Sequence, residues 1–222
     1  AINYSFDTQR TIGNMSVTYK FNNTDKLTVG LTTGISLNQF NSQKPISELV
    51  NSISTLYFEE NYMKLYESRF IKTYYSQELL NGFSINSSIS YEDRRALYNL
   101  NKYSADQNEG SNFTSNNPLE PLNYNTAPFE NHTIVKFKIN GIIRFGQKYL
   151  SYPGSKINIP NPKYPKFGFS FEKGISPNKS NYNFDHLSLN LNQKLTLENK
   201  GTLRYFAVAG TFFNNPKLAF ID

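Results

Sequence analysis

The sequence contains no cysteine and no tryptophan, and only 2 of its 222 residues are methionine. Without cysteine the chain can form neither a disulfide bond nor a thiolate metal site. No run of about 18 apolar residues occurs, so the sequence offers no transmembrane helix. Glycine-rich phosphate-binding patterns are also missing, which removes the common nucleotide-binding motifs. We therefore expect neither a cofactor nor a bound metal.

Positive charge is in moderate excess, with 23 Lys and Arg against 17 Asp and Glu and a formal net charge of +6. The basic residues never form a block of five or six, which favours a solvated surface over a nucleic-acid interface. The two histidines, His132 and His186, stand outside any metal-ligand or catalytic spacing motif. We predict no catalytic residues, no nucleic-acid partner and no enzymatic activity.

Aromatic residues are abundant at 15%, yet the mean hydropathy is −0.55 because Asn, Ser and Thr separate them. The clearest stretch is residues 187–197, where five of the six odd positions are leucine and every even position is polar. Such alternation is typical of a strand with one apolar and one polar face. At about 3.3 Å per residue and a tilt of roughly 40°, this stretch spans about 25 to 30 Å, the thickness of a hydrocarbon layer.

Alternation or high β propensity recurs along the whole chain. The expected strands are residues 13–21, 27–37, 70–77, 83–91, 133–145, 167–172, 187–197 and 203–213. Residues 1–7 and 216–222 resemble strands that are cut by the ends of the sequence, and residues 46–53 have the apolar spacing of one or two helical turns. We expect one β domain over residues 1–222, as a fragment of a longer chain.

The connections between these strands alternate in length. The short turns are residues 22–25, 78–82 and 198–201. The long segments 40–66 and 95–131 fall at the other end, as the external loops of outer-membrane barrels do. Residues 146–166, with four prolines, form a long connection on the short-turn side, which indicates a plug-like or docking segment or a missed strand. We predict an antiparallel, up-and-down transmembrane β-barrel, or a fragment of a larger one, with at least eight strands.

Charged residues suggest two candidate sites. Glu92, Asp93, Arg94 and Arg95 follow one another at the end of a strand, and we interpret them as an ion-pair cluster at a membrane rim or barrel mouth. The alternative is a site for a charged ligand or a partner loop. Charges on the polar strand faces would point into a lumen and give it a basic bias. These lumen candidates are Lys20, Lys136, Lys138, Arg144, Glu172, Lys194 and Arg204.

Several short motifs are rich in aromatic residues. They are Phe-Glu-Glu-Asn-Tyr at 58–62, Tyr-Glu-Asp-Arg-Arg at 91–95, Phe-Gly-Gln-Lys-Tyr at 145–149, Tyr-Pro at 164–165, Phe-Glu-Lys-Gly-Ile at 171–175 and Ala-Gly-Thr-Phe-Phe-Asn at 209–214. These motifs resemble segments of Bacteroidota outer-membrane proteins of unknown function that carry an N-terminal carboxypeptidase-regulatory-like domain ahead of a β-barrel. The resemblance implies a Gram-negative outer membrane, a missing N-terminal domain and signal peptide, and further strands after Asp222. It brings no catalytic residues.

We predict a non-enzymatic protein of the bacterial outer membrane, in contact with lipid, that acts as a pore, scaffold or surface-assembly component. Residues 40–66, 95–131 and 146–166 would contact other outer-membrane or periplasmic proteins. The alternative is a soluble β-sandwich or lipocalin-like module that binds a glycan or lipid, in which the leucines of residues 187–197 form a sealed core. A barrel enzyme would need one of the two histidines beside a nucleophile, and is the least favoured hypothesis.

Overall fold

The computed structural model describes residues 2–5, 10–41, 46–58, 60–98, 114–159, 161 and 163–214. One α-helix, α1 (Glu48–Phe58), and two short 3-10 helices, η1 (Ser180–Tyr182) and η2 (Glu198–Lys200), accompany the strands. The strands are β1 (Ile2–Ser5), β2 (Arg10–Lys20), β3 (Thr28–Gln39), β4 (Leu65–Leu80), β5 (Phe83–Ala96), β6 (His132–Arg144), β7 (Lys148–Tyr152), β8 (Ser155–Ile159), β9 (Lys166–Ile175), β10 (Phe184–Thr196) and β11 (Thr202–Phe213). The prediction of an all-β antiparallel protein is confirmed.

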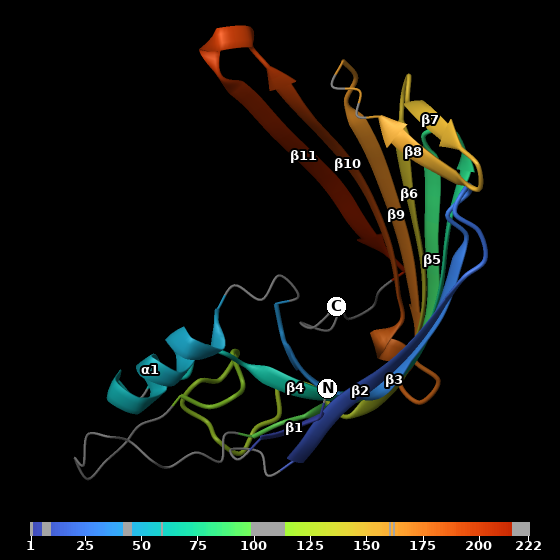
Figure 1. Ribbon diagram of the computed structural model, residues 1–222. Coiled ribbons are helices and arrows are strands. Elements are labelled where there is room, and N and C mark those ends of the chain that lie inside the picture. Colours follow the sequence, from blue (N-terminus) through green and yellow to red (C-terminus); the bar gives the residue numbers. More distant parts are fainter. Residues whose placement is uncertain are drawn as a thin grey trace.

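Nine of the strands form one strongly curved sheet in the order β1-β2-β3-β4-β5-β6-β9-β10-β11, and β7 and β8 form a separate hairpin (Figure 1). Each strand pairs antiparallel with its neighbour, so the sheet is an up-and-down meander. The short-turn end, at the top of Figure 1, carries the β10–β11 turn and the β7–β8 hairpin. The long-loop end, at the bottom, carries α1. The three predicted short turns lie at one end of the sheet and the two predicted long segments at the other, as expected.

In the nine-stranded sheet, the pairing register from β2 onward places odd-numbered residues opposite odd-numbered residues, except at the bulge near Leu80. Val17 lies opposite Leu31, and Phe171 lies between Ile139 on β6 and Leu187 on β10. Because side chains alternate along a strand, all odd-numbered side chains of these strands share one face. We call this the apolar face and the opposite, even-numbered face the polar face.

The eight expected strands are all present, but their lengths and surroundings differ in places from the prediction. β4 extends beyond residues 70–77 at both ends because β3 and β5 pair with it along its length. The helix α1 has 11 residues, more than the expected one or two turns. Residues 146–166 contain the hairpin β7–β8, the missed-strand alternative. The strand expected at residues 216–222 lies outside the described residues.

The sheet is not closed into a barrel. β1 and β11 form its two edges, and within the described residues neither pairs with the other. In that same part of the chain, no helix is long and apolar enough to cross a membrane.

Candidate functional site

The apolar face is widely exposed. Met15, Ile89 and Leu189 expose 67%, 54% and 58% of their surface. On the central strand β4, this face is free of charged side chains from Ile71 to Leu79. That stretch measures about 26 Å along the strand at about 3.3 Å per residue. An exposed apolar surface that crosses a whole sheet is far more than the scattered apolar residues of an ordinary soluble surface.

Charged residues on the apolar face are confined to the long-loop end and form ion pairs with one another. Within the described strands of this face they are Glu67, Arg69, Asp93, Arg95, Lys173 and Asp185. The pairs Arg69–Glu67, Arg95–Asp93 and Lys173–Asp185 have nitrogen–oxygen distances of 3.0, 2.8 and 2.8 Å. These residues mark one border of the charge-free band.

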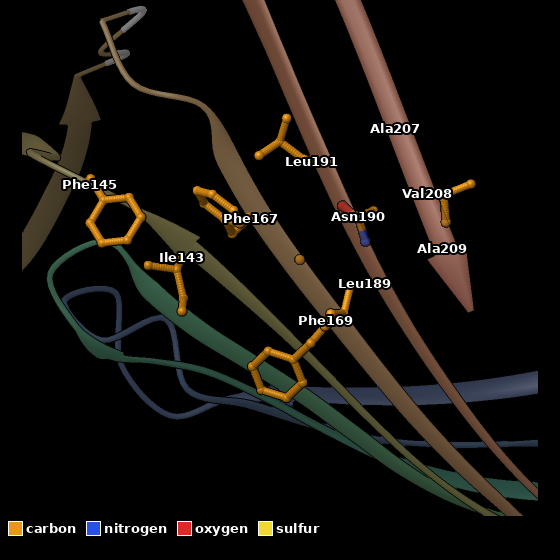
Figure 2. Close-up of a pocket in the computed structure, with 11 residues that line it drawn as sticks. Ile143, Phe145, Phe167, Phe169, Leu189, Asn190, Leu191, Ala207, Val208 and Ala209 are labelled. Atoms are coloured by element: carbon orange, nitrogen blue, oxygen red, sulfur yellow. The ribbon is translucent and has the colours of Figure 1, made fainter. Parts of the chain in front are cut away.

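A groove of about 510 Å³ crosses the apolar face between β6, β9, β10 and β11 (Figure 2). The rings of Phe145, Phe167 and Phe169 line one side of it. On the β11 side the small residues Ala207 and Ala209 leave it open. The groove offers dispersion contacts to an apolar chain and almost no polar partner.

The polar face carries a network of charged residues from three neighbouring strands. On β5, Arg94 Nε lies 3.1 Å from a Glu92 oxygen, and Lys136 Nζ on β6 lies 3.1 Å from the other. Lys136 also lies 3.7 Å from Glu172 on β9, whose second oxygen accepts a 2.8 Å hydrogen bond from Lys138. The side chain of Arg94 is 1% exposed. The polar face of the sheet thus carries a network of paired charges at its centre, where the opposite face carries exposed apolar side chains.

The structure does not bring the candidate cluster at residues 92–95 together as one site. Successive residues of β5 alternate between faces, so Glu92 and Arg94 join the polar-face network while Asp93 and Arg95 pair on the apolar face. A single ligand cannot contact all four side chains. Adjacent residues of a strand point to opposite faces, so the sequence alone was enough to predict that these four side chains are divided between the two faces.

The predicted lumen charges are even-numbered and share the polar face. Lys136, Lys138 and Glu172 belong to the network described above. Arg144 lies nearer the short-turn end, where its guanidinium donates a weak 3.5 Å hydrogen bond to the Ser84 hydroxyl. Lys20 lies on β2 at the other side of the sheet. The last two, Lys194 and Arg204, lie directly opposite each other near the β10–β11 turn.

An aromatic cluster covers the polar face at the long-loop end. Phe40, Tyr66 and Phe129 are buried with ring centroids 5.8 to 6.0 Å apart. His132 stacks on Tyr182 at 3.9 Å. No local pattern predicts this cluster, because its members come from loops and strand ends far apart along the chain.

The long loop before β6 is fixed to the strand ends by Asn116. Its side-chain amide donates 2.7 Å hydrogen bonds to the carbonyls of Leu65 and Leu97, and its oxygen accepts a 2.9 Å bond from the Leu65 N–H. Lys64 donates to Thr114 and to the Ser115 carbonyl at 2.9 and 2.6 Å. Desolvation by burial lowers the pKa of Lys64 to about 8.

At the short-turn end the hairpin β7–β8 is fastened to the sheet through Glu78. This carboxylate is 2% exposed and accepts hydrogen bonds from the Gly82 N–H at 2.9 Å and from Asn158 Nδ2 at 3.1 and 3.2 Å. Lys26 and Lys156 approach it to 3.4 and 3.5 Å. The hairpin therefore lies against the ends of the strands. The sequence left a strand within residues 146–166 open as one alternative, but it did not point to Glu78 as the anchor.

Within the described residues no group of three or more His, Cys, Asp or Glu side chains is arranged to hold a metal ion. Together, these features define an all-β protein built on one antiparallel sheet, with buried charge on one face and exposed apolar side chains on the other. The chain belongs to the family of unknown function DUF5686, whose C-terminal domain matches residues 1–222. No curated protein and no solved structure matches the chain.

Proposed function

We propose that this chain forms the wall of a β-barrel in the bacterial outer membrane and acts there as a non-enzymatic scaffold or pore. One observation carries the proposal, namely the charge-free apolar band across the exposed face of the sheet. Such a band, about 25 Å tall and outside a polar interior, is the property that lipid requires of a barrel wall. Lipid chains would cover the band and fill the groove of about 510 Å³ beside Phe167.

The polar face fits the interior of such a barrel. Glu92, Lys136 and Glu172 are held by ion pairs with nitrogen–oxygen distances of 3.1 and 3.7 Å, as charges away from bulk water must be. Backbone groups at a sheet edge cannot remain unpaired in hydrocarbon, so the proposal requires that β1 and β11 both be paired in the membrane. The Gram-negative, Bacteroidota setting and an N-terminal regulatory-like domain come from the resemblance and form part of this proposal.

The long-loop end would meet partner proteins. On the helix α1, Leu49, Tyr57 and Phe58 expose 71%, 64% and 70% of their surface. Exposed apolar side chains on a helix are typical of a docking surface. The histidines have packing roles, since His132 stacks on Tyr182 at 3.9 Å and His186 on Phe212 at 4.3 Å. These contacts favour a structural protein over an enzyme.

The test compares two adjacent residues of β2 that are both exposed and lie on opposite faces. Val17 on the apolar face is 57% exposed, and the exposed Ser16 on the polar face shares a 3.0 Å hydrogen bond with the Thr32 hydroxyl. If lipid covers the apolar face, Val17→Arg costs about 2 to 4 kcal/mol near the midplane and less toward the interfaces, whereas Ser16→Arg costs little. If the apolar face were instead the sealed core of a soluble protein, Val17→Arg would also be destabilising, so the location of the wild-type chain, in the membrane or in solution, separates the two cases.

The measurement is the amount of each variant in washed outer membranes and its folding yield into lipid vesicles. We expect wild type and Ser16→Arg in the detergent-extractable membrane fraction, and Val17→Arg reduced severalfold. Recovery of the wild-type chain as a soluble, monodisperse species would refute the proposal. Equal membrane yields of the two variants would refute the assignment of the apolar face to lipid.

A further inference from the structure

A second hollow, of about 340 Å³, lies on the polar face at the short-turn end, behind the apolar groove. We call it the basic hollow. Its polar lining comes from β6, β9 and β10, and consists of Asn140, Arg144, Lys166, Ser170, Asn190 and Asn192. The lining combines two cations with amide and hydroxyl groups and contains no carboxylate.

The two cations of the basic hollow lie directly opposite each other. Arg144 on β6 and Lys166 on β9 are register partners. A second pair of cations, Lys194 on β10 and Arg204 on β11, lies opposite each other two residues beyond Asn192, the β10 partner of Lys166. Like charges placed opposite each other across strands destabilise a sheet. Within the described part of the chain none of these four cations has an ion pair, whereas Lys136, in the neighbouring network, contacts Glu92 at 3.1 Å. The hollow therefore lacks the negative charge that would relieve the repulsion between the cations of its strands.

The neutral groups of the basic hollow are also available. Among the described residues, the side chains of Asn140, Asn190 and Asn192 have no hydrogen-bond partner. Gly168 forms the floor, and a Cβ atom at that position would lie 2.5 Å from the Asn190 amide. The absence of a side chain at position 168 thus lets Asn190 fold over the strand and present its amide to the hollow.

We infer that the basic hollow binds a phosphate-type oxyanion carried by a small, hydroxyl-bearing ligand such as a sugar phosphate. The planar guanidinium of Arg144 can donate two parallel hydrogen bonds to such a group, and the Lys166 ammonium supplies a second positive charge. The asparagine amides both donate and accept, as ligand hydroxyls require. The basic hollow is formed by the polar face of the sheet, whatever covers the apolar face. This inference therefore goes beyond the membrane proposal and does not rest on it.

The test is a calorimetric titration of the purified chain, in detergent or in buffer, with inorganic phosphate and with a hexose phosphate at constant ionic strength. Glucose and chloride are the neutral and anionic controls. We expect saturable binding of both phosphates, and tighter binding of the hexose phosphate if the amides contact its hydroxyls. Equal affinities identify the free oxyanion as the ligand. Binding of glucose alone, or no phosphate binding by the wild type, would overturn the inference.

Variants separate a site from general charge attraction. Arg144→Gln should weaken phosphate binding tenfold or more, and Lys20→Gln, which removes the same charge from the polar face on β2, should leave it unchanged. Lys166→Glu places opposite charges across the strands, so it should raise the thermal midpoint while it abolishes binding. Misfolding cannot produce that combination. Equal weakening by Arg144→Gln and Lys20→Gln would reduce the site to nonspecific attraction and refute it.

Discussion

The anchor of the β7–β8 hairpin predicts a large effect from one substitution, Glu78→Ala. The Glu78 carboxylate accepts a 2.9 Å bond from the Gly82 N–H and bonds from Asn158 at 3.1 and 3.2 Å. Of its two lysine partners, Lys26 is 42% exposed and can be solvated by water, whereas Lys156 is 12% exposed and would be left without a counter-charge. Loss of one partner from a buried pair costs about 3 to 5 kcal/mol, and we expect about 3 to 4 kcal/mol here.

The assay is denaturant unfolding together with limited trypsin digestion. Trypsin cleaves after lysine, and the burial of Lys156 should protect that bond in the wild type. Glu78→Ala should make the bond after Lys156 accessible to trypsin. Glu78→Gln keeps an acceptor for the Gly82 N–H and should lower the stability by roughly half as much. Glu130→Ala is the control, because Glu130 is 69% exposed and pairs with Lys179 at the surface, where ion pairs contribute about 0 to 1 kcal/mol. A cost for Glu78→Ala no greater than for Glu130→Ala, with no new cleavage, would show that Glu78 does not anchor the hairpin.

Three further predictions concern the loop end and the sheet. Burial lowers the pKa of Lys64 from 10.5 to about 8, so between these pH values the unfolded chain binds more protons than the folded chain. The free energy of unfolding of the wild type, measured relative to Lys64→Met, should therefore rise between pH 8 and 10.5. Asn116→Ala removes hydrogen bonds of 2.7, 2.7 and 2.9 Å to buried backbone and should cost about 3 kcal/mol in urea unfolding, with m unchanged. Gly30→Ala places a Cβ against the Tyr74 ring and should cost about 1 to 3 kcal/mol. Adding Tyr74→Ala should recover part of that cost, and no recovery would contradict this packing.

The strands themselves were predictable because alternation is a local property. Residues 187–197 show their two faces in the order of their side chains, and β10 adopts that strand in the structure. Face assignments followed from the same count of odd and even positions. The prediction failed where local pattern is weak, in the hairpin β7–β8 and along the full length of β4, since pairing with neighbouring strands stabilises them there.

Local alternation of side chains was enough to locate the eight strands with a clear pattern and to sort their residues into an apolar and a polar face. Which charged side chains form ion pairs depends on how the strands pair in the folded sheet. Glu92, Lys136 and Glu172 are far apart along the chain, and the pairing register of three strands brings them within ion-pair distance. The same register places Arg144 opposite Lys166. A shift of one residue would turn every side chain of a strand to the other face, so the choice of register is a property of the whole sheet and not of any single strand.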